Sequence, residues 1–428
     1  MRIGFYLGRE THLKTLGSLI QQSISQHYNV KLFYRQPQGL GGKSYQGVKP
    51  DALAVFGLPA SEVIGVNDFS QLLSLVPCPD ILIVHEGFHT LNKDLDYVTE
   101  LRERGTRIVS IMHFFEAAQH HLMALDLFDL TIYPSDFGRD LHFKLQCAKE
   151  ESVREKESRR HQYVVAGEPM FDQIEKISRQ EARKELNIPS SARVVLFIAP
   201  VISLVTPWRF HVWAREDKLS QTRDVLRIGK PQYVYEIWTG HRFDHIVKAI
   251  RRFCDRNSAM LIVKSRGKQK IRPNLQQSAD LFLDGFEDVY FPVFTTYKLM
   301  AAADLCFTVN SMAAVEAVVS GIPCVNIYVP HLDLAESLDR VKGEYLEILL
   351  NGKPNSLMNY PGCISNVDRR NFLNWLDGTM LSDFRVDRRS QEKYKRRFLG
   401  MGDLSASERI LNVLATKFMG KSGEHGGI

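Results

Sequence analysis

Several patterns that would assign a function at once are missing from this chain of 428 residues. Its six cysteines form no C-x-x-C pair, which argues against a metal or redox site built from them. No apolar run reaches the roughly 20 residues that a membrane-spanning helix needs. The first residues, MRIGFYLGRETH, lack the apolar h-region of a signal peptide. We therefore expect reduced cysteines in a cytoplasmic protein.

Two motifs of metal and phosphate chemistry are absent as well. The histidine-rich stretch SIMHFFEAAQHH contains no H-E-x-x-H, and its adjacent His120 and His121 cannot both face one metal ion. The glycine-rich QGLGGKSY lacks the spacing of a phosphate-binding loop, because Pro37 stands where the first glycine should be. We expect no metal and no cofactor, and we interpret residues 38–45 as a flexible loop near an acceptor.

The charge balance is modest. A net charge of +6 suits anionic ligands such as nucleotides, or weak attraction to an anionic membrane, and establishes neither. The basic segment RVDRRSQEKYKRRF, after Phe384, is typical of a solvated helix; a patch on the inner face of the cell membrane is the alternative. No nucleic-acid partner is expected.

Short apolar runs alternate with helical patterns in both halves of the chain. RIGFYL, DILIVH, RIVSIMHF and LTIYPSD in the first half, and ARVVLFIAP, AMLIV, DVYFP, DLCFTV and IPCVNIYV in the second, have the composition of buried parallel strands. This pattern predicts an α/β protein with two doubly wound, Rossmann-like domains that face a central cleft. We place the N-terminal domain at 1–165, the C-terminal domain at 166–384, and a basic helix, a closing helix and a flexible tail at 385–428.

The second half carries one acid in an apolar helix. Asn310 and Ser311 end a strand, and the backbone N–H groups from Met312 onward begin a helix whose positive end suits a phosphate. Ser311 is expected as the N-cap or as a phosphate ligand. Glu316, among alanines and valines, can accept hydrogen bonds from the two vicinal hydroxyls of a ribose; a surface glutamate is the alternative.

Cations follow another strand of the same half. Lys264 and Arg266 come after AMLIV, where a doubly wound domain binds its ligand. They can stabilise the negative charge of a departing diphosphate. A solvated loop is the alternative.

Histidines follow the strands of the first half. His12 lies where the loop after RIGFYL meets a helix, and a neutral imidazole can remove a proton from a hydroxyl; capping or packing is the alternative. His85, Glu86 and His89 follow a second strand, and His113 and Glu116 a third. An acid that orients a histidine and fixes its tautomer allows the imidazole to act as a general base.

Another strand of the first half ends in YPSDFGRD. Asp136 in this segment is expected to be either a general base or a turn or helix-capping residue.

Four stretches in order carry a resemblance to a known family. VVAGEPMFDQI with EARKELNIP, VYFPVFTTYKLMAAAD, the segment AAADLCFTVNSMAAVEAVVSGIPCVNIYV, and MGDLSASERILNVLA look like bacterial capsule-polysaccharide and CDP-glycerol glycerophosphotransferase-type enzymes of the GT-B fold. The resemblance implies a nucleotide-activated donor in the C-terminal domain, with Ser311 near its phosphates and Glu316 at its ribose. It also implies that His12 is the general base. Where relatives often have a His-Pro pair, this chain has Lys264 and Ser265.

We therefore predict a glycosyltransferase that moves a sugar, or a polyol phosphate, from a nucleotide donor to a surface-glycan or lipid-linked acceptor. The predicted catalytic residues are His12, His113 and Glu116. The predicted donor-binding residues are Lys264, Arg266, Asn310, Ser311, Met312 and Glu316. The alternatives are a non-hydrolysing nucleotide-sugar 2-epimerase and a non-catalytic relative that binds a glycan or a partner.

Overall fold

The computed structural model describes most of the chain. The described residues are 1–37, 47–67, 69–74, 77–85, 95–113, 128–147, 162–199, 218–227, 229, 231, 234, 243–265, 273–309, 311–328 and 353–418. They form two compact units. Unit 1 comprises Met1–Lys176, Val289–Phe294 and Glu392–Ile428, and unit 2 comprises Ile177–Asp288 and Thr295–Gln391.

Unit 1 contains a seven-stranded parallel sheet in the order β3-β2-β1-β4-β5-β6-β7. Its strands are β1 (Arg2–Leu7), β2 (Asn29–Arg35), β3 (Val63–Val66), β4 (Ile81–His85), β5 (Arg107–Ile111), β6 (Leu130–Tyr133) and β7 (Tyr163–Val165). The chain reverses its direction of travel across the sheet between β1 and β4. In doubly wound sheets, ligands bind outside the carboxyl ends of the strands at such a point.

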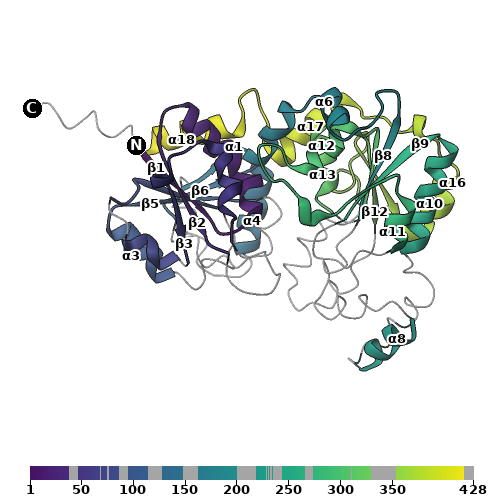
Figure 1. The fold of residues 1–428 in the computed structure, drawn as a ribbon, viewed down its shortest axis with the longest axis horizontal. Helices are drawn as coiled ribbons and strands as arrows, with labels where there is room; N and C mark the ends of the chain where they lie inside the picture. Colours follow the sequence, from purple (N-terminus) through teal and green to yellow (C-terminus); the bar gives the residue numbers. More distant parts are fainter. Residues whose placement is uncertain are drawn as a thin grey trace, which may run out of the picture. The chain divides into compact units, whose positions relative to one another are not determined.

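Helices cover both faces of this sheet (Figure 1). The helices of unit 1 are α1 (Thr11–Ser25), α3 (Leu95–Glu103), α4 (Asp136–Cys147) and α18 (Ala406–Phe418), and α17 (Arg388–Leu399) continues from unit 2. Successive side chains of β1 point to opposite faces of the sheet. Phe5 packs in one core, with α1 and α18, and Tyr6 packs in the other, with α3. Side chains that alternate along a strand explain this division.

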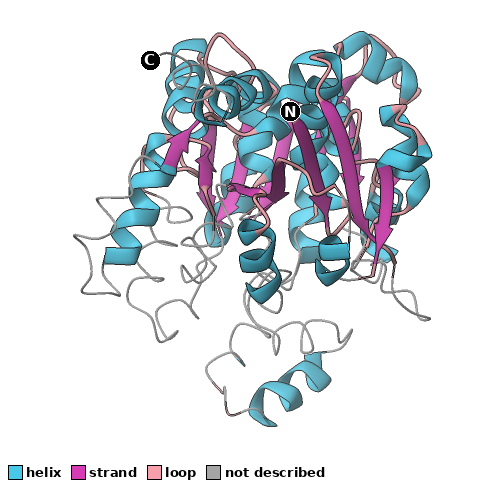
Figure 2. Ribbon diagram, turned by 90° about the vertical axis from the view of Figure 1, so that its left-hand side faces the viewer, coloured by secondary structure: helices cyan, strands magenta, loops and turns pink. Residues whose placement is uncertain are grey.

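Unit 2 contains a six-stranded parallel sheet in the order β10-β9-β8-β11-β12-β13, also between helices (Figure 1). Figure 2 shows the described strands of the chain in magenta and its helices in cyan. Its strands are β8 (Arg193–Ile198), β9 (Ala259–Lys264), β10 (Leu281–Leu283), β11 (Leu305–Val309), β12 (Cys324–Tyr328) and β13 (Ile364–Asp368). Its helices are α6 (Arg179–Glu185), α8 (Lys218–Arg227), α10 (Phe243–Arg256), α11 (Pro273–Ser278), α12 (Thr295–Ala302), α13 (Ala313–Val319) and α16 (Arg369–Asp377). The switch point lies between β8 and β11. The predicted pair of doubly wound α/β domains is confirmed.

The same carboxylate arrangement recurs at the amino ends of the strands in both units. An aspartate directly precedes a strand, accepts a backbone N–H from the start of the neighbouring strand, and pairs with arginine. The four cases are Asp80 with Arg2, Asp129 with Ile108, Asp280 with Leu261 and Asp304 with Val194. Each carboxylate therefore fixes the alignment of two adjacent strands at the end opposite to the ligand side.

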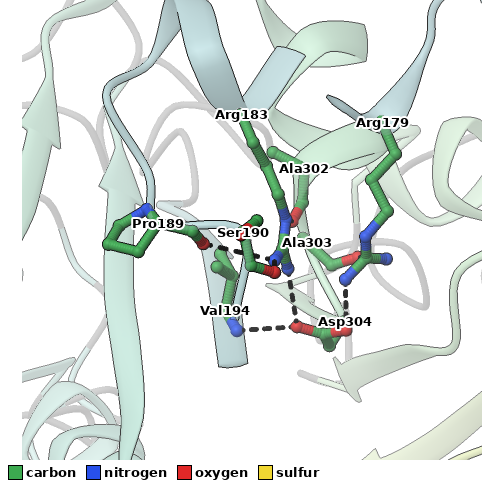
Figure 3. A network of polar contacts seen from close by, with 8 residues as sticks. All are labelled: Arg179, Arg183, Pro189, Ser190, Val194, Ala302, Ala303 and Asp304. Atoms are coloured by element: carbon green, nitrogen blue, oxygen red, sulfur yellow. Dashed lines mark hydrogen bonds and ion pairs between the residues drawn. The ribbon is translucent and has the colours of Figure 1, made fainter. Parts of the chain in front are cut away.

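Asp304 is the most elaborate of these carboxylates (Figure 3). Its Oδ2 accepts from the backbone N–H of Val194 at 2.8 Å and from Arg183 at 3.2 Å, and its Oδ1 pairs with Arg179. The Arg183 side chain, only 7% exposed, also donates to three backbone carbonyls, those of Pro189, Ser190 and Ala302. The network joins α6, the turn before β8 and the end of α12 around one carboxylate.

We expect Asp304→Ala to lower the free energy of unfolding by about 3 kcal/mol, because it leaves the buried Arg183 without its counterion. The measurement is urea denaturation of the full chain. The control is Asp377→Ala, since Asp377 pairs with Arg256 at a half-exposed site and such surface pairs contribute less than about 1 kcal/mol. Equal losses for the two variants would contradict this prediction.

The boundaries of the units differ from the predicted division at 165 and 384. Residues 166–176 stay with unit 1, because Asp172 accepts from the backbone N–H groups of Ala406 and Ser407 and so caps α18. DVYFP was predicted as a strand, but Val289–Phe294 forms none and packs in unit 1.

Phe291 explains why residues 289–294 belong to unit 1. Its ring stacks on Phe56, with 5.0 Å between centroids, and lies against Gly17 of α1. A Cβ at Gly17 would come within 2.3 Å of the Phe291 ring, so only glycine lets the ring approach the helix this closely. Gln173 holds the same segment by accepting from the backbone N–H of Phe294 at 2.9 Å.

In the part of the chain that the structure describes, no helix is both long enough and apolar enough to cross a membrane. Cys78 is partly exposed, whereas Cys254, Cys306, Cys324 and Cys363 are buried as free thiols. The predicted basic helix after Phe384 is present as α17. The segments 148–161, 206–217 and 419–428 lie outside the described residues.

Candidate functional site

Three histidines gather at the carboxyl ends of adjacent strands in unit 1. His12 is the second residue of α1, directly after β1; His85 is the last residue of β4; and His113 follows β5. The ring centroids of His12 and His85 are 4.7 Å apart, and those of His85 and His113 are 6.3 Å apart. The three rings, here called the histidine row, therefore lie at the switch point where the fold predicts a ligand.

His12 is buried, and its Nδ1 accepts the backbone N–H of Gly8 at 3.2 Å. A nitrogen that accepts carries no proton, so the neutral ring has its proton on Nε2. Burial, together with the charge of Arg9, lowers the pKa of His12 to about 3. His12 is thus a neutral hydrogen-bond donor through Nε2 at neutral pH. This geometry favours a binding role over the predicted role as general base.

His85 stands between the other two rings and has no hydrogen-bond partner on either nitrogen. Only 8% of the surface of His85 is exposed. Burial, followed by the charges of His12, His113 and Arg9, holds its pKa well below 6.5. His85 is therefore a neutral imidazole that presents one N–H and one lone pair.

His113 forms a dyad with Glu168, which accepts a short hydrogen bond from its Nδ1. A carboxylate only accepts, so Nδ1 carries the proton and Nε2 carries the basic lone pair. Glu168 is 2% exposed, and its second oxygen, Oε2, has no partner. An imidazole oriented by a buried carboxylate is the arrangement of a general base.

Glu168 was not predicted from the sequence, and Glu116, the acid proposed beside His113, lies outside the described residues. Glu168 is 55 residues further along the chain, in the turn AGEPM after β7. The available signal was its position, because an acid after a strand belongs to the same edge of the sheet as the histidines. Glu86, His89, His120 and His121 also lie outside the described residues.

Asp136, the other candidate at a strand end, does not join the row. It begins α4, its side chain is largely exposed, and it pairs with Arg139 one turn later at 2.7 Å. The capping contact at this helix comes from Ser135 instead, whose Oγ accepts the backbone N–H of Gly138 at 3.1 Å, so Asp136 does not cap α4. Within the described residues, no group of three or more His, Cys, Asp or Glu side chains is arranged to hold a metal ion.

In unit 2, the predicted residues on α13 lie at the carboxyl end of β11, beside the switch point. Glu316 is 4% exposed, in a helix of which every residue is buried. The alternative reading of Glu316 as a surface residue is therefore wrong. Ser311 is buried, and its Oγ accepts from the backbone N–H of Ala313 at 3.3 Å. Met312, rather than the predicted Ser311, is the residue that directly precedes α13. Ser311 lies one position earlier and contacts the start of the helix through its hydroxyl.

Lys264, the last residue of β9, is 4% exposed and forms an ion pair with Asp288 at 2.9 Å. Its charge is therefore balanced within the protein, and the reading of Lys264 as part of a solvated loop is wrong. Arg266 and Asn310, the other predicted donor-binding residues, lie outside the described residues.

No family model matches the chain, and no curated protein matches it. Solved structures do. A putative UDP-N-acetylglucosamine 2-epimerase from Listeria monocytogenes has a TM-score of 0.56 at 11% identity, over 100% of this chain and 99% of the other. UDP-GlcNAc 2-epimerase from Neisseria meningitidis, bound to UDP-GlcNAc, has a TM-score of 0.53 at 12% identity, over 97% and 100%. The enzyme of that name from Methanocaldococcus jannaschii has a TM-score of 0.53 at 13% identity, over 97% and 100%.

The likeness establishes the fold. It confirms the two-domain α/β class of GT-B type over nearly the whole chain. At 11–13% identity it carries no activity from these proteins to this chain.

The neutral histidines predict a loss of stability in mild acid. The unfolded chain takes up a proton on His12 near pH 6.5, whereas the folded chain takes it up only near pH 3. Stability is therefore full above pH 6.5 and falls as the pH falls toward 3. Between pH 7 and pH 5, His12 alone is expected to remove about 2 kcal/mol of unfolding free energy.

Urea denaturation at pH 7 and pH 5 measures this effect. His12→Gln should show a smaller difference between the two pH values than the parent chain, by about that amount. His27→Asn replaces an exposed histidine in a left-handed turn with the residue that tolerates that turn best, and should leave the difference unchanged. The same pH dependence in all three proteins would show that His12 titrates normally.

Proposed function

We propose that this protein transfers a sugar, or a polyol phosphate, from a nucleotide-activated donor to a hydroxyl group of an acceptor. The observation that carries the proposal is the dyad of His113 and Glu168, at the carboxyl edge of the sheet in unit 1. Group transfer to a hydroxyl needs one base to take the hydroxyl proton. The dyad supplies it, while His12 and His85 stay neutral beside it.

In this mechanism the acceptor oxygen attacks the donor as its proton moves to Nε2 of His113. The bond between the transferred group and the nucleotide phosphate breaks, and the phosphate leaves with the bonding electrons. Glu168 holds the ring in the tautomer that accepts at Nε2, and it stabilises the imidazolium that forms. The Nε2–H of His12 donates a hydrogen bond to the substrate.

Unit 2 is proposed to bind the donor nucleotide. Glu316 accepts from the ribose hydroxyls, and its position on α13, which follows the carboxyl end of β11, supports this role. The hydroxyl of Ser311 and the residues around Met312 lie close to the donor phosphates. Lys264 contributes less to their stabilisation than an unpaired cation would, because the carboxylate of Asp288 balances its charge.

The nature of the acceptor belongs to the same proposal. A surface glycan or a lipid-linked acceptor, made in the cytoplasm of a bacterium for its capsule or cell envelope, is supported by the ordered motifs between residues 164 and 415. The basic helix α17 supports contact with an anionic membrane surface through its exposed arginines and lysines, among them Arg388, Arg389, Lys393, Arg396 and Arg397.

Binding of the donor is tested by thermal melting with UDP-N-acetylglucosamine, CDP-glycerol, and GDP- and CMP-linked sugars. A ligand at 100 times its Kd should add about 2.7 kcal/mol to the stability of the folded state. Glu316→Gln should reduce the shift given by the best ligand, since the amide cannot replace the charged acceptor. Glu181→Gln, an exposed acid of the same unit, should leave it unchanged.

A panel in which no nucleotide raises the melting temperature of the parent chain would contradict the donor site. A shift that survives in Glu316→Gln would remove this residue from the site and leave the rest of the proposal standing.

The dyad is tested by Glu168→Gln in a transfer assay with the donor that the panel identifies. We expect kcat to fall about 10²- to 10⁴-fold, because the amide neither selects the basic tautomer nor stabilises the imidazolium. The melting shift given by the donor should be unchanged, as the donor binds in unit 2. Measurement of kcat across pH 5–9 separates a lost base from a misfolded site, and an unchanged kcat would disprove the assignment.

The second candidate is a nucleotide-sugar 2-epimerase, favoured by the names of the solved structures with TM-scores above 0.5. Such an enzyme works on the nucleotide sugar alone. Incubation of the chain with UDP-N-acetylglucosamine in the absence of any acceptor distinguishes the two, because epimerised sugar would overturn the transferase proposal. A non-catalytic binding protein is the third candidate, and turnover of any donor excludes it.

A further inference from the structure

The burial of His85 without hydrogen bonds lowers the stability of the folded chain. A buried polar atom without a partner costs free energy, and both nitrogens of this ring are in that position at 8% exposure. The contacts that hold the two neighbouring rings do not involve His85, since Gly8 pairs with Nδ1 of His12 and Glu168 pairs with Nδ1 of His113. Such an unpartnered buried group needs an explanation, and for a ring at the carboxyl edge of the sheet a ligand that completes its hydrogen bonds is one.

The surroundings of His85 limit what that ligand can be. The titratable groups that act on it are His12 at 4.7 Å and His113 at 6.3 Å between ring centroids, together with Arg9. Behind His113 lies the buried carboxylate of Glu168, which has an unpartnered oxygen of its own. The described residues therefore offer neutral imidazoles, one cation and one anionic acceptor at this edge of the sheet.

We infer that His85 binds a hydroxyl group of an uncharged polyol or sugar. A neutral imidazole offers one donor and one acceptor, and a hydroxyl offers the complementary pair. A phosphodiester, which only accepts hydrogen bonds, would leave the lone pair of His85 unsatisfied. The inference rests on the proposed function in one respect, namely that this hydroxyl belongs to the acceptor.

His85 would act as a specificity-determining residue beside the base. It keeps its own proton throughout, holding the acceptor in the row while the reacting hydroxyl passes its proton to Nε2 of His113. A site that hydrogen-bonds a hydroxyl discriminates strongly against analogues without one, because its own buried groups are then left unpaired. The sequence placed His85 at the end of a strand but gave no reason to prefer it to Glu86 or His89.

The first test observes the ring directly, by ¹H–¹⁵N NMR of the histidine side chains in the full chain. The signals of His85 are identified by their loss in His85→Asn. Glycerol should shift these signals, and dimethyl phosphate, which has no hydroxyl, should not at the same concentration. A shift with dimethyl phosphate alone, or no shift with either probe, would overturn the inference. Because no nucleotide is used, a positive result stands even where the donor panel fails.

The second test compares stability with turnover in His85→Phe and His85→Asn. Phenylalanine removes both unpaired nitrogens and keeps an aromatic ring, so the melting temperature should rise by about 2–4 °C. Acceptor kcat/KM should fall about tenfold or more, while the donor-induced melting shift is retained. Asparagine keeps a donor and an acceptor and should retain more activity than phenylalanine. Equal activity of the two variants would overturn the assignment.

Thr131→Val is the matched control. Thr131 is buried in β6, and its hydroxyl also lacks a partner. Its removal should leave or raise the melting temperature in the same way, yet leave kcat/KM unchanged. A fall in melting temperature in both His85 variants, with acceptor kcat/KM unchanged, would show that His85 serves the packing of unit 1 and would overturn the inference.

Discussion

Four pairs of parallel strands are aligned at their amino ends by aspartates, and much of the architecture depends on that alignment. Asp80, Asp129, Asp280 and Asp304 each bond the backbone of the neighbouring strand and each pair with arginine. Because adjacent parallel strands keep their register along their length, a contact at one end determines which residues become neighbours at the other. Stability and chemistry are thereby assigned to opposite edges of each sheet.

The histidine row is a direct product of this arrangement. Each imidazole comes from a different part of the chain, and each reaches the row because its strand ends at the same edge. Burial keeps His12 and His85 uncharged, and the single charged acceptor in the row, Glu168, is bonded to His113. The three rings are thus chemically different despite their identical side chains, because each has a different partner: a backbone N–H, none, and a carboxylate.

Much of this was accessible from the sequence, for physical reasons that differ between residues. Buried parallel strands are continuous apolar runs, so DILIVH and DLCFTV identified both the sheets and the residues at their ends, including His85 and Glu316. Glu168 was missed because its partnership with His113 depends on tertiary contact across 55 residues. The tautomer of His12 could not be predicted from the sequence either. It depends on the backbone N–H of Gly8, which reaches Nδ1 of His12 only in the folded loop and so leaves the proton on Nε2. The prediction of a strand at DVYFP was wrong, because its apolar pattern comes from an aromatic ring, Phe291, that packs on α1 and not from a buried strand.

The division of unit 1 into three stretches of sequence has a consequence during synthesis of the chain. Its first 176 residues leave the ribosome long before Phe291, which lies against Gly17, and longer still before Leu411 and Leu414 of α18 join the core beside β1. Unit 2, by contrast, has all its residues by Gln391. The amino-terminal unit is therefore completed after unit 2, and its nascent apolar surface must wait for the synthesis of α18 to be covered.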